Sequence, residues 1–412
     1  MPQFEEQFGV LSPTTQGLLI SCILIAASLT STLSGPLSDR ISRTYTIATG
    51  GAVYTIGSAI GASAMGLPQL FIGRCIAGVG EGLFISSITV YVTEISPSSS
   101  RGRLSTTVQL FNTIGTMTGR HPEAEVAHAK LGLRVPESKK EEVGAPGVMD
   151  APRIESRREV WKHIKEMFAK DVRGRTMLGV FLMGIQQCSG IDAVLYYAPV
   201  LFGQAGLSSK TASFLASGVS GILMVVLTAV ALVFQDKWTR RAPMIGGGLC
   251  IGGAMTLIGI LYASRANEVP AGRWSIIVLI YLFVASFVST WAIACRIVCS
   301  EIQPSRTRAS AASLGQCSNW VVNTVIAFVT PLFLARTTSG PYFFFGGCTF
   351  FGVLVCVIFL PETKGLDLET IDKGFVETPL QSALRKRLLR RRNVFENDPD
   401  IELEAIETTT NS

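Results

Sequence analysis

Long apolar blocks separated by short polar connections dominate the chain. Nine of these blocks contain about 20 residues or more, the length that a helix needs to cross the hydrocarbon core of a bilayer. They lie near residues 16–36, 45–65, 68–95, 175–203, 211–235, 243–263, 275–299, 310–335 and 341–360. A membrane β-barrel would instead show segments of about ten residues with alternating polarity. The pattern predicts an all-α polytopic membrane protein.

Composition agrees with this class. Hydrophobic residues make up 48% of the 412 residues and charged residues 16%, whereas soluble domains carry about 25% charge. All nine cysteines lie in apolar blocks, where we expect them to pack as small residues rather than to form disulfides. No metal-ligand set and no nucleophile–base pair is evident, so we expect no cofactor, no metal site and no enzyme activity. The small residues of 73–82 favour close helix packing over nucleotide binding, and we expect no nucleic-acid partner.

A tenth apolar block, 104–119, ends abruptly at the polar stretch that begins with Arg120. Its 16 residues would extend only about 24 Å as a helix, short of a hydrocarbon core of about 30 Å. Crossing would also carry the twelve Lys and Arg residues of 120–174 to the outer side. We therefore expect a half-inserted or tilted helix, with 120–174 as a cytoplasmic loop.

The basic connections set the expected orientation, because Lys and Arg favour the cytoplasmic side of short loops. The basic connections are 38–44, 96–103, 236–242, 305–309, the loop 120–174 and the tail after 360. Six spans between 175 and 360 then start and end in the cytoplasm. The N-terminal half does not close in this way, because an even number of crossings is needed between residues 103 and 120 and only one short block is present.

An internal repeat supports this count. Asp39 and Arg43 are spaced like Asp236 and Arg240. In the same way, Glu94 to Arg101 and Glu301 to Arg308 are both seven residues apart. In the C-terminal half the Asp motif follows the second span and the Glu motif follows the fourth. A matching N-terminal half would have one more span before residue 16 and about one and a half more near 119.

Four regions follow from these patterns. We expect an incomplete N-terminal helical bundle, an interdomain helical loop, a C-terminal six-helix bundle and a largely disordered cytoplasmic tail. Their boundaries are 1–119, 120–174, 175–360 and 361–412.

An ordered set of motifs then resembles the sugar porter family of the major facilitator superfamily, especially its fungal sugar and quinate-type members. The motifs are "GPLSDRISR" (35–43), "GRCIAGVGEG" (73–82), "YVTEISPSSSRG" (91–102), "GIQQCSGIDAVLYYAP" (184–199), "SEIQPSRTRA" (300–309), "NWVVN" (319–323) and "PETKGLDLE" (361–369). The "PESPRW"-type motif of the family is missing. The resemblance implies a major facilitator fold that lacks its first span and about one and a half spans around the fifth and sixth.

The resemblance also implies a function: alternating-access transport of a monosaccharide, hexose or pentose, coupled to protons, in a multi-pass plasma-membrane protein. Neutral amides facing a central cavity suit sugar hydroxyls, although amides in membrane helices also serve as packing contacts. The implied substrate-binding residues are Gln109, Gln186, Gln187, Asp192, Asn319, Trp320 and Asn323. The implied gating aromatic residues are Tyr196 and Tyr197.

The repeated charges are expected to form a breakable cytoplasmic latch between two moving halves. Ion pairs are expected among the four charges of each half. The implied latch residues are Asp39, Arg43, Glu94, Arg101, Asp236, Arg240, Glu301, Arg308 and Glu362, with Lys364 beside them. The competing interpretation is that these charges are topology signals, since exposed pairs contribute only about 0–1 kcal/mol.

Two other functions remain open at this stage. The chain could be a transport-defective truncated product, because membrane segments are missing from the expected pattern. It could also be a non-transporting sugar sensor, although sensors of this family tend to have longer tails. As a shortened transporter, the chain is expected to transport sugar poorly or not at all. Arg296, inside an apolar block, is expected either to face a cavity or to reach the membrane interface.

Overall fold

The computed structural model describes residues 13–97, 99–118, 165–170, 172–204 and 215–364, and the regular structure within them is helical. The α-helices are α2 (Pro13–Ile41), α3 (Arg43–Ala62), α4 (Leu67–Ile95), α5 (Arg101–Thr118), α8 (Arg173–Gln187), α9 (Ile191–Gln204), α11 (Ser220–Phe234), α12 (Gly248–Ala263), α13 (Pro270–Ser289), α14 (Trp291–Glu301), α15 (Arg308–Arg336) and α16 (Gly340–Phe359). Short π-helical turns precede α11 and α12 at Leu215–Val219 and Pro243–Gly247, and a 3-10 turn, Ala266–Glu268, precedes α13.

Seven helical stretches of the described chain are long and apolar enough to cross a membrane. They are Gly17–Ile41, Leu67–Ile95, Arg173–Ala198, Pro243–Ala263, Pro270–Glu301, Arg308–Leu334 and Gly340–Phe359. The sequence predicted nine. Helix α3 is long enough but carries many Gly and Thr residues, and the described part of the block 211–235 is the shorter apolar helix Ser220–Phe234.

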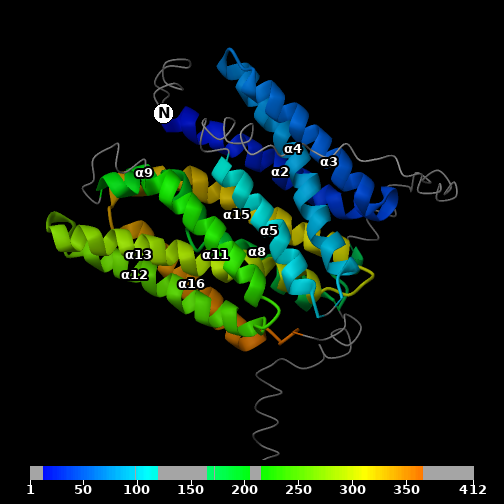
Figure 1. Cartoon of the computed structure of the whole chain (residues 1–412). Coiled ribbons are helices and arrows are strands. Elements are labelled where there is room, and N and C mark those ends of the chain that lie inside the picture. The colour runs from blue at the N-terminus through cyan, green and yellow to red at the C-terminus, as the bar shows by residue number, and fades with distance from the viewer. Residues whose placement is uncertain (1–12, 98, 119–164, 171, 205–214, 365–412) are drawn as a thin grey trace, which may run out of the picture.

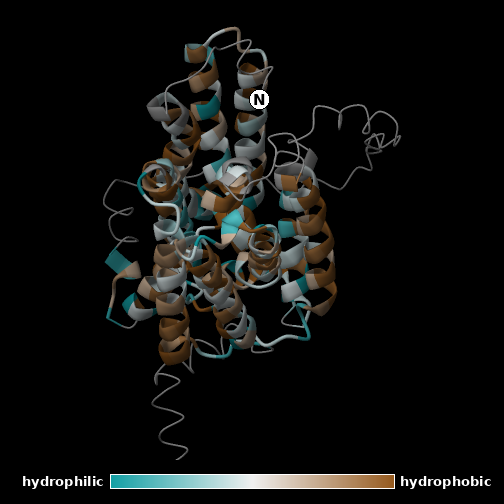
Figure 2. Ribbon diagram, turned by 90° about the vertical axis from the view of Figure 1, so that its left-hand side faces the viewer, coloured by the Kyte–Doolittle hydropathy of each residue, from teal (hydrophilic) through white to brown (hydrophobic). Residues whose placement is uncertain are grey.

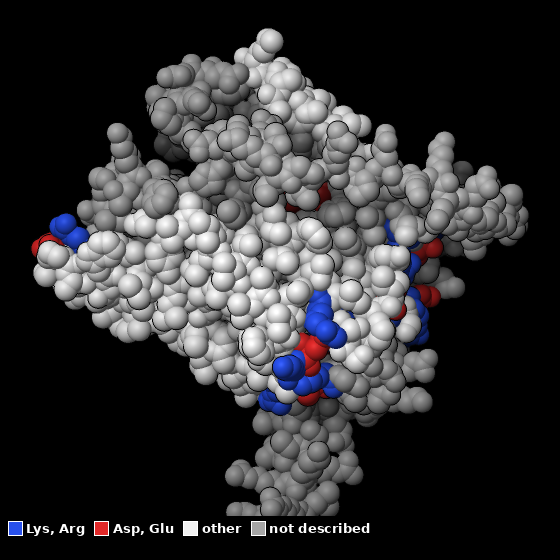
Figure 3. All heavy atoms as spheres, in the orientation of Figure 1, with Lys and Arg blue, Asp and Glu red and all other residues white. Residues whose placement is uncertain are grey.

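Hydrophobic residues cover much of the helix surface (Figure 2). Charged residues gather near helix ends, and a broad uncharged face lies between them (Figure 3). This distribution is the one expected of helices surrounded by lipid.

Helices α2 to α5 and helices α8 to α16 form two groups that lie against each other (Figure 1). Helix α2 of the first group packs along α15 of the second, and α5 packs along α11. The repeat relates these contacts, because the Asp motif lies at the end of α2 and directly after α11, while α5 and α15 follow the Glu residues of the Glu motif. Each half therefore contacts the other half through the same two helices of the repeat.

Close packing of α3 on α4 depends on glycine. A Cβ atom on Gly57 would lie 2.2 Å from the backbone nitrogen of Ala77, and one on Gly80 would lie 2.3 Å from that of Tyr54. Side chains at these positions would force the two helices apart. The interpretation of 73–82 as a helix-packing surface is confirmed.

Two of the membrane-spanning stretches are interrupted. Helix α8 ends at Gln187 and α9 begins at Ile191, with Gly190 between them at φ +86°. Helix α13 ends at Ser289 and α14 begins at Trp291. Such interruptions place polar backbone groups inside a helical membrane protein, where they are tolerated if they are buried in protein or line a cavity.

Several predicted regions lie outside the described residues. These are most of the loop 120–174, the tail beyond residue 364 and the connection 205–214. The block 104–119 is described to Thr118 as helix α5, which packs against α4, α11 and α14.

Candidate functional site

A cluster of amide side chains joins α8 to α15 beside the interruption that follows Gln187. Asn319 donates to the backbone oxygen of Met183 at 2.9 Å and to Gln186 Oε1 at 3.1 Å. Its own Oδ1 accepts a hydrogen bond from Gln187 Nε2 at 3.0 Å. These side chains are at most 8% exposed. The structure thus brings three of the predicted binding residues into direct contact.

Gln186 also connects the two interrupted stretches. Its Nε2 donates to the backbone oxygen of Trp291 at 2.8 Å, at the first residue of α14. The indole nitrogen of Trp291 in turn donates to the backbone oxygen of Met244 at 2.8 Å. The amide cluster is therefore held in place by the two helix interruptions.

Four of the predicted binding residues have a buried polar atom without a hydrogen-bond partner among the described residues. These atoms are Gln187 Oε1, Asn323 Oδ1, Gln109 Oε1 and Trp320 Nε1. Buried polar groups are normally satisfied, and an unpaired one costs about 1–3 kcal/mol. Such atoms, three acceptors and one donor, are of the kind that can bond to hydroxyl groups.

The two predicted gating tyrosines connect α9 to α15. Tyr197 donates its hydroxyl to the backbone oxygen of Ala327 at 2.9 Å. Asn323 donates from Nδ2 to the Tyr196 hydroxyl at 3.5 Å. Both contacts follow the α8–α9 interruption, so a movement of α9 relative to α15 would break them.

Trp320 lies on the side of α15 that faces the other half. Its side chain is buried, at 8% exposure, in an apolar cluster with Leu24 and Ala27 of α2. The indole therefore forms part of the contact between the two halves.

Gln109 and Arg296 line one hollow between α4, α5 and α14. The other residues that line it include Thr89 and Ala292. Arg296 also lines a second hollow, which reaches Gln316 of α15. Of the two alternatives for Arg296, the structure supports a position beside a cavity.

Three charges lie within the membrane-spanning helices near this region. Arg296 interacts electrostatically with Asp192 in the first turn of α9 and with Glu81 of α4. Sequence reasoning missed Glu81, because it treated the segment 73–82 as a helix-packing surface only. A carboxylate inside an apolar block was the signal that could have identified it.

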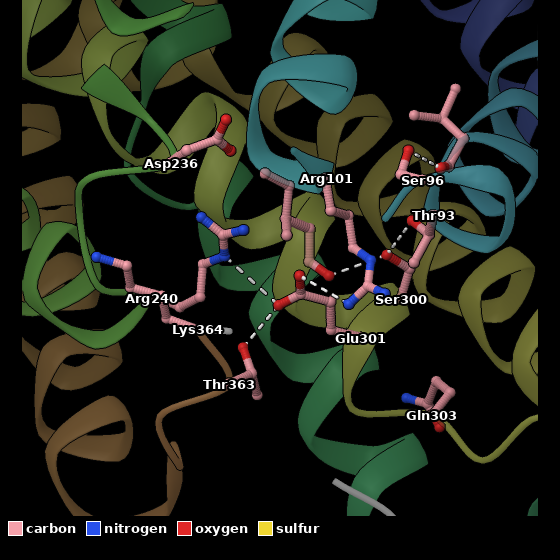
Figure 4. A network of polar contacts seen from close by, with 12 residues as sticks. Thr93, Ser96, Arg101, Asp236, Arg240, Ser300, Glu301, Gln303, Thr363 and Lys364 are labelled. Atoms are coloured by element: carbon pink, nitrogen blue, oxygen red, sulfur yellow. Dashed lines mark hydrogen bonds and ion pairs between the residues drawn. The ribbon is translucent and has the colours of Figure 1, made fainter. Parts of the chain in front are cut away.

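The charged latch, defined here as the nine predicted residues from Asp39 to Glu362, has its centre at Glu301 (Figure 4). The Glu301 carboxylate is only 1% exposed and lies 3.6 Å from Arg101 Nη1 and 3.5 Å from Arg240 Nε. The Thr363 hydroxyl donates to the same carboxylate at 2.6 Å. An unpaired buried charge is strongly destabilising, so these partners hold the carboxylate in the interior.

Arg101 makes this centre a contact between the halves. The sequence predicted pairs within each half, yet Arg101 begins α5 of the first half and Glu301 ends α14 of the second. The reason is geometric: α5 packs between α4 and α11, which brings its first turn to the end of α14.

A second contact between the halves lies next to the first. Arg103 forms an ion pair with Asp236, and its backbone nitrogen donates to Asp236 Oδ1 at 3.0 Å. Gly102 allows this approach, because a Cβ atom there would lie 2.6 Å from Asp236 Oδ1. Arg103 was not among the predicted latch residues.

Other latch residues act within one half. Arg43 pairs with Asp39 at 3.0 Å and donates from Nη2 to Glu94 Oε1 at 2.9 Å. Arg308 donates to the backbone oxygen of Gln303 at 3.0 Å. These contacts connect the ends of helices that belong to the same group.

Glu362 binds the turn that precedes α12. Its carboxylate accepts hydrogen bonds from the backbone nitrogens of Arg240 at 2.7 Å and Arg241 at 3.1 Å. Partial burial alone would raise the pKa of Glu362, but the backbone N–H groups of Arg240, Lys364 and Arg241 and the Thr239 hydroxyl lower it below its usual value. The carboxylate is therefore ionised at neutral pH.

Comparisons with known proteins agree with the motifs. The family profile described as "Sugar (and other) transporter" matches residues 3–136 and 120–375. The chain is 29% identical over 404 residues to the glucose transporter GlcP of Staphylococcus epidermidis, covering 88% of this chain and 89% of that protein. It is 26% identical over 474 residues to the quinate permease of Neurospora terricola, covering 98% and 88%.

A solved structure shows the same fold. The proton:xylose symporter XylE of the major facilitator superfamily, bound to 6-bromo-6-deoxy-D-glucose, is similar with a TM-score of 0.69 and 21% identity. The match covers 90% of this chain and 93% of XylE. The described helices therefore have the major facilitator fold.

Proposed function

Because the chain belongs to the sugar porter family of the major facilitator superfamily, a transporter family rather than an enzyme family, we propose that it moves a monosaccharide across a membrane by alternating access. We propose that the transport is coupled to protons. The observation that best supports sugar binding is the buried amide cluster of Gln186, Gln187 and Asn319, in which Gln187 Oε1 has no hydrogen-bond partner among the described residues. The relatives include proteins named as a glucose transporter, a galactose–proton symporter and a quinate permease, and these names indicate the range of substrates to test.

The proposed sugar site lies between the halves. Gln186, Gln187, Asp192, Asn319, Trp320 and Asn323 would contact the sugar from the second half, and Gln109 from the first. The amides accept and donate hydrogen bonds, and the Trp320 indole offers an apolar face for the sugar ring. Tyr196 and Tyr197 would close the site from the α9 side.

The charged latch would hold the two halves together at one end and release them at each cycle. Arg101 supports this role, because its partner Glu301 belongs to the other half. A breakable contact of this kind is what rocking of two repeats around a central site requires.

We further propose that the plasma membrane holds the chain with the loop 120–174 and the tail on the cytoplasmic side. About one and a half spans around the fifth and sixth of the N-terminal half would be missing, with α5 as a tilted or half-inserted helix. A glycosylation acceptor placed near Ala145 tests this orientation. A glycosylated product would contradict it, because glycosylation occurs on the opposite side of the membrane.

The function itself is tested by exchange of labelled sugar. The full chain is reconstituted in lipid vesicles, and exchange of D-glucose, D-galactose, D-xylose and quinate is measured, with intrinsic tryptophan fluorescence as a binding assay. The account predicts slow, saturable exchange of at least one compound. Binding without exchange would favour the transport-defective product or the sensor. The absence of both binding and exchange would contradict the proposal.

A further inference from the structure

Three ionisable side chains lie inside the membrane-spanning helices where the two halves meet. Glu81 lies midway between Leu67 and Ile95, the ends of its span. Arg296 lies on α14 of the other half, and Asp192 lies on α9. Arg296 interacts electrostatically with both carboxylates, and its Nε is buried without a hydrogen-bond partner in the described chain.

The charges of this group do not balance. One guanidinium faces two carboxylates, so these three groups together carry one excess negative charge when all are ionised. A charged side chain at the centre of a membrane helix is energetically costly unless its charge is balanced. Addition of one proton to a carboxylate oxygen removes this charge.

The geometry distinguishes the two carboxylates. Asp192 and Arg296 belong to the same half, so a relative movement of the halves leaves their separation unchanged. Glu81 belongs to the other half, and its interaction with Arg296 acts across the contact between α4 and α14. Only Glu81 loses its positive neighbour when the halves part.

Within the described part of the chain, no second positive charge is found to interact with Glu81. Tyr54 of α3 interacts electrostatically with Glu81 and belongs to the same half. Among the described residues of the helices packed on α4, Arg296 is the cation that interacts electrostatically with Glu81. Arg296 thus decides whether Glu81 is favoured as a carboxylate or as a carboxylic acid.

We propose that Glu81 takes up and releases the transported proton, and that Arg296 links its protonation to the movement of the halves. Ionised Glu81 is attracted to Arg296 and favours the joined arrangement. A proton from the side opposite the latch binds the carboxylate, removes this attraction and lets the latch end open. Release of that proton at the latch end restores the charge, and the halves rejoin. This assignment rests on the proposed transport function.

Infrared difference spectroscopy tests the assignment without any substrate. Spectra of the purified full chain in lipid are compared between acidic and weakly alkaline pH. The parent chain should show the C=O band of a protonated, buried carboxylic acid. Glu81→Gln should lose this band, and Glu81→Asp should restore it at a shifted frequency. Glu268→Gln, which changes a carboxylate in the 3-10 turn before α13, is the control and should keep it.

Three results would overturn the proposal: a band that persists in Glu81→Gln, a band that disappears in Asp192→Asn instead, or the absence of a band from the parent.

A transport assay provides the second test. In vesicles, Glu81→Gln should retain measurable exchange of D-glucose across the membrane but should no longer concentrate it when a pH gradient is applied. A mutant that still concentrates D-glucose like the parent would overturn the proposal. A parent chain without exchange would instead count against the transport function, and the infrared result would still decide whether Glu81 binds the proton.

Discussion

The hydroxyl oxygens of Thr93 and Ser300 lie 2.8 Å apart, and both side chains are buried. Thr93 precedes Glu94 at the end of α4, and Ser300 precedes Glu301 at the end of α14. Equivalent positions of the internal repeat therefore touch each other. This is the arrangement expected of two structural repeats related by a pseudo-two-fold axis. It also marks the end of the molecule at which the halves would have to separate.

The amide cluster is expected to determine sugar affinity. Gln187→Ala and Asn319→Ala should each weaken binding by about 1–3 kcal/mol, roughly 5- to 150-fold, because each removes a buried hydrogen-bonding group. Gln69→Ala is a matched control. Gln69 lies in the first turn of α4, away from the amide cluster, and donates a hydrogen bond to the backbone oxygen of Ser63. The measurement is the concentration dependence of sugar exchange in vesicles. Unchanged affinity in both cluster variants would rule out this site.

Arg101 is expected to stabilise the joined halves more than Arg103 does. Removing one partner of a buried pair costs about 3–5 kcal/mol, whereas an exposed pair contributes about 0–1 kcal/mol. The Arg101 side chain is 6% exposed and that of Arg103 is 58% exposed. In a Ser300→Cys background, Arg101→Gln should therefore increase labelling by a membrane-impermeant maleimide at the latch end several-fold.

Arg103→Gln is the control for this experiment and should change the labelling much less. The chain that retains Ser300 and carries only the native cysteines gives the background labelling. Equal labelling in the Arg101 variant and its parent would reduce the charged latch to a set of topology signals.

These pairings show where sequence reasoning was sufficient and where it was not. The apolar blocks and the repeated charges located the helices and the charged ends, because both depend on local pattern. The sequence did not show that Arg101 contacts Glu301, because a repeat identifies equivalent positions and not their partners. The interruption at Gly190 lies among glycines and polar residues, which are a local sequence signal, whereas the one at Thr290 lies in an apolar run without such a signal. Sequence reasoning did not identify Glu81, because the small residues around it were interpreted as helix-packing residues, which they are.

Gly102 is expected to be required for the contact between α5 and Asp236. A methyl group there would lie 2.6 Å from Asp236 Oδ1 and 3.1 Å from Arg240 Nη1. Gly102→Ala should therefore lower the thermal unfolding temperature. Gly174→Ala changes the equivalent second residue of α8, where a Cβ atom meets nothing within 4 Å, and should be neutral or slightly stabilising. Equal effects of the two substitutions would contradict this account of Gly102.

Glu362 predicts a specific pH dependence of stability. Its pKa is lower in the folded protein than the usual value of about 4.3 for glutamate in an unfolded chain. Its contribution is therefore complete above the unfolded pKa and is lost as the pH falls through the folded pKa. The stability difference between the parent and Glu362→Gln should be constant above about pH 5 and should shrink below about pH 4. A difference that grows toward low pH would contradict the sign of this shift.

Cross-linking of Thr93 to Ser300 tests alternating access most directly. In a Thr93→Cys, Ser300→Cys double variant, the short distance between the side chains should allow a disulfide to form under mild oxidation. The account predicts that this cross-link stops sugar exchange in vesicles and that reduction restores it, because the halves cannot separate at the latch end while the bond is present. The two single variants, treated in the same way, should keep exchanging sugar. Exchange by the cross-linked chain at the rate of the reduced chain would contradict the account.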